Sequence, residues 1–84
     1  MNDLPATRLH HVVVVNEQSG AVWNAGHARI RDGRLVVPAG QPPARFFEQP
    51  AATFRIEAVD GGGRVRRFPN LVLVSRSSEE YVFD

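Results

Sequence analysis

Six prolines and two Asp-Gly turn signals break this 84-residue chain into short segments. Proline lacks a backbone N–H and fixes φ, so it ends helices and interrupts sheets. No window carries an apolar stripe at helical spacing. Valine and isoleucine number 14, against six leucines and methionines, and β-branched side chains pack well on a pleated surface. These features favour strands and argue against a fold built on long helices.

Strand-like segments follow one another along the chain, separated by turn residues. They are residues 8–15, 21–24, 27–31, 34–37, 53–59, 64–68, 71–76 and 81–83, with Gly26 marking a bulge and Pro69-Asn70 a turn. Six or seven short strands joined by hairpins predict an all-β domain over residues 8–84, a small antiparallel barrel or sandwich with the strand count of SH3-like or OB-like barrels. At most one helical turn is expected, near residues 44–49. Residues 1–7 are expected to form a flexible lead-in.

Two hairpins have predictable registers. Asp-Gly is favoured in type I′ turns, where both central residues have positive φ, so the turn at Asp32-Gly33 places Ile30 opposite Leu35. The second turn contains three glycines, residues 61–63. A three-residue loop with a G1-type bulge pairs apolar with apolar residues there, and the expected partners are Ile56 with Phe68, Glu57 with Arg67, and Val59 with Val65.

Charge and cysteine content limit the classes of function. All ten basic residues are arginine, nine acidic residues oppose them, and the net charge is +1. A dedicated nucleic-acid-binding protein usually carries a larger basic excess. The absence of cysteine excludes disulfides and thiolate metal sites. With no apolar stretch of about 20 residues and no signal-like start, we expect a cytoplasmic protein.

Groups able to carry chemistry are few. His10 and His11 are adjacent on a predicted strand and should point to opposite faces, so with His27 they are not expected to form a metal site. The serines lie in or beside turns, and Glu79-Glu80 lie at a polar terminus that would not raise a pKa. The glycine run precedes a strand rather than a helix and is not a phosphate loop. We expect no enzymatic activity, no metal and no cofactor.

Two segments could form contact surfaces. The unbroken run of Val12, Val13, Val14 and Val15 fits either a central strand covered on both faces or an edge that pairs with a partner or with a second copy. The proline-rich loop at residues 38–43, with Phe46 and Phe47 after it, fits either an exposed contact or a crossover whose phenylalanines close one end of the barrel.

The arginine-rich hairpin could bind nucleic acid. Arg64 and Arg66 should share one face, with Arg55 near them on the neighbouring strand, and Trp23 or Tyr81 could stack on bases. The alternative is a solvated hairpin in which Arg67 pairs with Glu57 across the strands.

We therefore expect a small protein-binding module that acts by surface contact. It could be an adaptor or an inhibitor encoded by a phage or other mobile element, for example against a host defence complex. The candidate contact residues are Val13, Val15, Trp23, Phe46, Phe47, Arg64 and Arg66. The alternative function is single-stranded nucleic-acid binding, and its candidate residues are Arg55, Arg64, Arg66, Trp23 and Tyr81.

Overall fold

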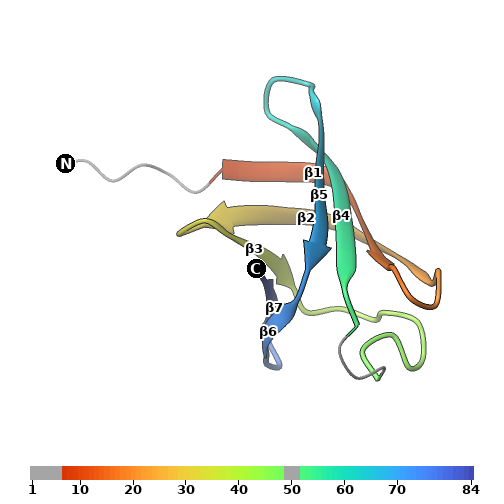
Figure 1. Cartoon of the computed structure of the whole chain (residues 1–84). Helices are drawn as coiled ribbons and strands as arrows, with labels where there is room; N and C mark the ends of the chain where they lie inside the picture. The colour runs from red at the N-terminus through yellow and green to blue at the C-terminus, as the bar shows by residue number, and fades with distance from the viewer. Residues whose placement is uncertain (1–6, 49–51) are drawn as a thin grey trace.

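A single curled sheet makes up the fold. The computed structural model describes residues 7–48 and 52–84. The strands are β1 (Thr7–Asn16), β2 (Val22–Arg31), β3 (Arg34–Pro38), β4 (Phe54–Asp60), β5 (Val65–Leu71), β6 (Leu73–Arg76) and β7 (Glu80–Phe83). They lie antiparallel in the order β5-β4-β1-β2-β3-β7-β6, and the sheet curls strongly into a half-barrel (Figure 1). The predicted all-β class is confirmed. The structure is a half-barrel formed by one curled sheet, and not a sandwich of two sheets.

Helices are absent from the described residues. The segment expected to hold one helical turn is described as far as residue 48 and forms two successive turns. In the first, the Phe46 N–H donates to the Pro43 carbonyl (3.1 Å), and in the second the Glu48 N–H donates to the Arg45 carbonyl (3.3 Å). The same described part of the chain therefore has no helix that could cross a membrane. The predicted lead-in lies outside the described residues except for Thr7, which begins β1.

Both hairpin registers are confirmed. Ile30 lies opposite Leu35, and Asp32 and Gly33 have positive φ values of 53° and 76°. In the second hairpin the pairs are Ile56 with Phe68, Glu57 with Arg67, and Val59 with Val65. These pairings depend on residues close in sequence, which is why the sequence specifies them.

The curl of the sheet follows from the way β5 passes into β6. Only Val72 separates these two strands, yet they are the opposite edges of the sheet. Val72 exchanges two backbone hydrogen bonds with Asp84, each 3.0 Å long. The turn predicted at Pro69-Asn70 is wrong. β5 runs through both residues, and Asn70 (φ 57°) lies at an irregularity in the pairing with β4.

A bulge divides β1 and β2 into two halves. His11 has no partner between the His10–His27 and Val12–Gly26 pairs, and Ala25 is the extra residue on β2. His11 and Gly26 both have positive φ, 52° and 90°. The expected bulge at Gly26 is therefore present, but β2 continues through it as one strand rather than two segments. An extra residue on each strand bends the ribbon at this point.

β1 is a central strand. It pairs with β2 on one side and β4 on the other, so the hypothesis that residues 12–15 form an edge for strand pairing is wrong. Val12 and Val14 point inward and are fully buried, whereas Val13 and Val15 point outward and are half-buried. The valine run therefore serves the core on one face and lies on the outer surface with the other.

Aromatic rings fill the end of the core that lies beside β7. Phe46 and Phe47 pack with their ring centroids 5.1 Å apart, and Trp23 and Tyr81 with theirs 5.5 Å apart. Asn16, which is fully buried, joins this end to the β1–β2 turn. Its side-chain amide donates to the Phe46 carbonyl (2.9 Å). One buried amide thus connects two segments 30 residues apart.

Candidate functional site

The predicted aromatic contact residues belong mainly to the core. Trp23, Phe46 and Tyr81 are only 6%, 2% and 7% exposed. The expectation that Trp23 or Tyr81 presents a stacking surface is therefore wrong, and so is an exposed role for Phe46. Phe47 is half-buried beneath the guanidinium of Arg76, whose Cζ lies 4.8 Å from the ring centroid. The structure agrees with the alternative hypothesis, in which Phe46 and Phe47 close one end of the barrel.

The alternation of inward and outward side chains along β2 is the pattern that could have predicted the burial of Trp23. Trp23 pairs with Val14, whose side chain points inward. Val22 and Asn24 on either side of it are exposed. The sequence did not show which of the two neighbours faces the core, because Val22 and Trp23 are both apolar.

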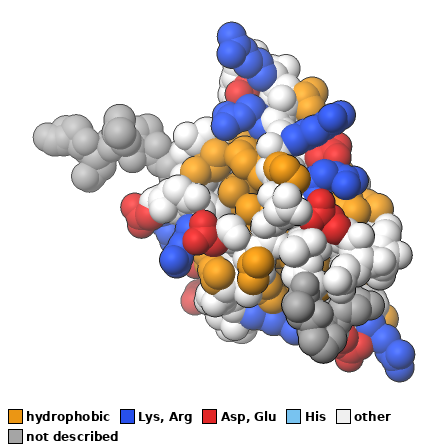
Figure 2. Space-filling view, in the orientation of Figure 1, with side chains coloured by type: hydrophobic (Ala, Val, Ile, Leu, Met, Phe, Trp, Pro, Cys, Tyr) orange, Lys and Arg blue, Asp and Glu red, His pale blue; other side chains and the backbone are white. Residues whose placement is uncertain are grey.

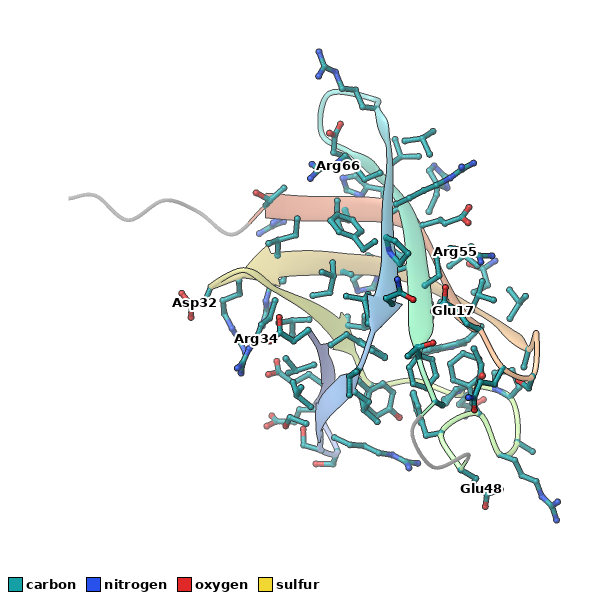
Figure 3. The ribbon with its side chains drawn as sticks, in the orientation of Figure 1. Glu17, Asp32, Arg34, Glu48, Arg55 and Arg66 are labelled. Atoms are coloured by element: carbon teal, nitrogen blue, oxygen red, sulfur yellow. The ribbon has the colours of Figure 1, made fainter. Side chains whose placement is uncertain are left out.

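The arginine hairpin does not form one basic surface. Arg66 lies opposite the inward-facing Ala58, and its guanidinium sits 5.2 Å from the Phe68 ring centroid. Arg55 points to the outer face and pairs with Glu57 at 2.7 Å. Figure 3 shows the two labelled arginines, Arg66 and Arg55, on opposite sides of the β4–β5 hairpin. The expectation that Arg55 joins Arg64 and Arg66 is wrong, because alternation along the strands separates them.

Arg67 lies opposite Glu57 in the register, as expected for a solvated hairpin. The ion pair of Glu57, however, is with Arg55 on its own strand. No described carboxylate forms an ion pair with Arg67. Arg67 therefore remains an outward-facing charge beside Glu57.

Asp60 organises the turn of this hairpin. Its carboxylate accepts hydrogen bonds from the backbone N–H groups of Arg64 (3.0 Å) and Gly62 (2.9 Å). The Arg64 N–H is the largest influence holding the pKa of Asp60 below its ordinary value of 3.8, and the Gly62 N–H and the Arg66 guanidinium lower the pKa further, against a partial desolvation that raises it. These interactions favour the charged carboxylate. The lowered pKa of Asp60 is therefore explained by the hydrogen bonds that form the turn.

Five valines lie on the outer face of the sheet across four neighbouring strands. We call this surface the valine face, and its members are Val13, Val15, Val22, Val59 and Val65. Val22 and Val65 are 54% and 67% exposed. Figure 2 shows arginines, carboxylates and hydrophobic side chains alternating along the β4–β5 side of the molecule. Of the predicted contact residues, Val13 and Val15 belong to this face.

A second surface lies over the other half of β1 and β2 and the end of β3, next to Val59 of the valine face, which is opposite His10. It is a groove of about 1040 Å³. We call it the basic groove, and its basic lining residues are Arg8, His10, His11, His27, Arg29 and Arg31. The bulge brings His11 into the same groove as His10, so the expectation that the two are separated on opposite faces is wrong. Within the described residues, no group of three potential ligands is placed to hold a metal ion.

Sequence reasoning missed the basic groove. Its signal was the pairing of the strand at residues 8–15 with the strand at residues 27–31, which puts Arg8 opposite Arg29 and His10 opposite His27. A bulge on each strand has to be placed correctly before that register can be drawn. A second, smaller hollow of about 380 Å³ lies beside Phe47, Arg76 and the prolines of the loop.

Comparisons with known proteins give no relative: no family model, no curated protein and no solved structure matches this chain.

Proposed function

We propose that this protein is a non-enzymatic protein-binding module that contacts its partner through the valine face. The observation that carries the proposal is the position of five valines on one outer surface, two of them more than half exposed. Valine side chains on a solvated sheet face lose apolar exposure when a partner covers them, and that burial favours association. An adaptor or a small inhibitor encoded by a mobile element would act by such contact alone.

Polar neighbours suit the valine face to a reversible contact. Val22 and Val15 lie in register with Arg55, and Val13 lies in register with Glu57 and Arg67. Interfaces between separately folded proteins combine apolar contacts with charged groups, and arginine is enriched in them. The charged side chains among the valines would fix the orientation of the partner.

The size of the domain also fits contact over a whole face. A standard interface buries about 800 Å² on each partner. That is roughly a seventh of the 5469 Å² surface of this protein. A partner of ordinary size would therefore cover much of the outer surface of β2, β1, β4 and β5.

Charge substitutions at the most exposed valines test the proposal. Val65→Glu and Val22→Glu place a carboxylate where the native side chain is already 67% or 54% exposed, so the fold should tolerate both. We expect each to weaken capture of a specific partner by at least about tenfold, the effect of losing one interface anchor. The measurement is quantitative affinity capture with the wild-type protein and each variant.

Val74→Glu is the matched control, because Val74 is 45% exposed on β6, away from the valine face. A partner retained by this variant and lost by the other two supports the proposal. A partner captured equally by all four proteins contradicts it. A second copy is one candidate partner, and a doubled mass in sedimentation that Val65→Glu returns to the monomer would assign the valine face to self-association.

A further inference from the structure

Basic side chains are paired across strands in the basic groove. Arg8 lies opposite Arg29, and His10 lies opposite His27, all four on the outer face because Leu9 and Ala28 between them are buried. Like charges directly opposite each other destabilise a sheet. An anion bound between them would remove that repulsion. We propose that the basic groove binds the sugar–phosphate backbone of single-stranded nucleic acid.

The groove keeps an excess of positive charge. Among the described residues, Glu80 is the carboxylate that pairs with its arginines, and it is shared between Arg29 (3.3 Å) and Arg31 (2.9 Å). Arg8 forms no ion pair with any described carboxylate. Both Arg29 and Arg31 have side chains that are 45% exposed, so their remaining N–H groups can meet a ligand from solvent.

The donors match the chemistry and spacing of phosphates. The guanidinium fork suits phosphate oxygens, and an imidazole N–H can donate to the same atoms. Arg8 and His10 are two residues apart on one strand, a distance of about 6.7 Å. Successive phosphates of an extended single strand have a similar separation. Each pair of facing donors can therefore take one phosphate.

An acidic peptide fits the groove less well. An extended peptide usually binds a sheet by pairing with a free strand edge. Both edges of β1 and both edges of β2 are already paired. The groove also has no phenylalanine, tyrosine or tryptophan among its lining residues, so it lacks the large rings on which bases usually stack. Recognition would be through the phosphates and independent of base sequence.

The width of the cationic track favours one strand over a duplex. It covers β1 and β2, whose axes are about 4.8 Å apart. Two of its neighbours on the outer face are uncharged: Val59 lies opposite His10 on β4, and Val36 lies opposite Arg29 on β3. The third, Arg34, lies opposite Arg31 on β3 and is paired with Asp84 (3.6 Å). A duplex presents two phosphate chains across grooves of about 6 and 12 Å, and the sheet has no second cationic row to meet the other chain.

The test is fluorescence anisotropy with a labelled oligothymidine of about 16 nucleotides, the upper range of site size for small barrels, titrated across salt. We expect binding to the wild-type protein, with log K falling by about 0.7 per phosphate contact for each unit of log salt concentration. Arg8→Glu should weaken binding by at least about tenfold and reduce that slope. Its melting temperature should not fall, because the new carboxylate faces Arg29 with the opposite charge.

Arg45→Glu is the matched control, because it makes the same change in net charge at a side chain that is 84% exposed and lines the other hollow. Salt at about 0.15 M screens charges farther away than about 8 Å, so this variant should bind within about twofold of wild type. Any of four results would overturn the proposal: no binding by the wild type, equal loss in both variants, tighter binding of a matched duplex, or equal displacement by polyglutamate. The valine face is tested separately by Val22→Glu and Val65→Glu, because neither residue lines the basic groove.

Discussion

Asn16 illustrates how one polar side chain can hold distant segments together. Its carbonyl oxygen accepts hydrogen bonds from the N–H groups of Gln18 (2.9 Å) and Ser19 (3.1 Å), while its amide donates to Phe46. The side chain has no contact with solvent. A buried polar group is tolerated when its hydrogen bonds are made, and here they fix both the β1–β2 turn and the turn after the proline loop.

Removing this amide should be costly. Asn16→Ala leaves the Phe46 carbonyl without this donor at a buried position, so we expect the free energy of unfolding to fall by about 3 kcal/mol. Urea denaturation measures the change. Asn24→Ala, at an exposed position on β2, should cost no more than about 0.5 kcal/mol. Equal effects of the two substitutions would show that the hydrogen bonds of Asn16 are not a main support of the fold.

At the scale of single residues, the sequence was a better guide to pairing than to exposure. The expected partners Ile30–Leu35 and Ile56–Phe68 are both present. The exposure of Trp23 and Tyr81 was wrong, because alternation defines which residues share a face but not which face is covered. The covered face is decided by Phe46 and Phe47, which follow the proline-rich loop and pack on Trp23 from more than 20 residues away in the sequence.

At the scale of elements, the β4–β5 hairpin is specified locally. Gly63 has φ 81°, and its N–H donates to the Asp60 carbonyl (3.0 Å). The Asp60 side chain binds two further backbone N–H groups of the same turn. Turn residues and register therefore agree, and both are contained within a few residues of sequence.

The lowered pKa of Asp60 gives this turn a pH dependence. A carboxyl group whose pKa is lower in the folded than in the unfolded state adds stability above its unfolded pKa, ordinarily 3.8, and loses it as the pH falls through the folded value. Asp60→Asn removes the charge. We expect the wild type to be the more stable protein near neutral pH, with the difference shrinking as the pH is lowered below 3.8. Urea denaturation at several pH values tests this, and a difference that does not vary with pH would contradict it.

Elements that depend on distant partners could not be predicted from the sequence. The β1–β4 and β3–β7 pairings join residues at least 38 positions apart, and no turn residue specifies them. The short connection at Val72 also carries the chain from one edge of the sheet to the other without a turn residue to mark it. Between strands that are so far apart in the sequence, the register is set by the packing of their apolar faces.

For the whole molecule, one bulge organises the outer surface. At His11 and Gly26 the β1–β2 ribbon bends, and the outward side chains change from arginine and histidine to valine and asparagine. The valine face could be anticipated in part from Val13 and Val15. The basic groove could not, because it depends on the register on both sides of the bulge.

The two proposals together give the outer face of the sheet two binding surfaces with different ligands. The most direct measurement is a ¹H–¹⁵N NMR titration of the protein with the oligothymidine. Perturbed resonances should belong to the half of β1 and β2 that carries Arg8, His10, His27 and Arg29, while Val15 and Val22 of the valine face, beyond the bulge, remain unchanged. Perturbations centred on Val65 and the arginine hairpin instead, or spread equally over both surfaces, would contradict the claim.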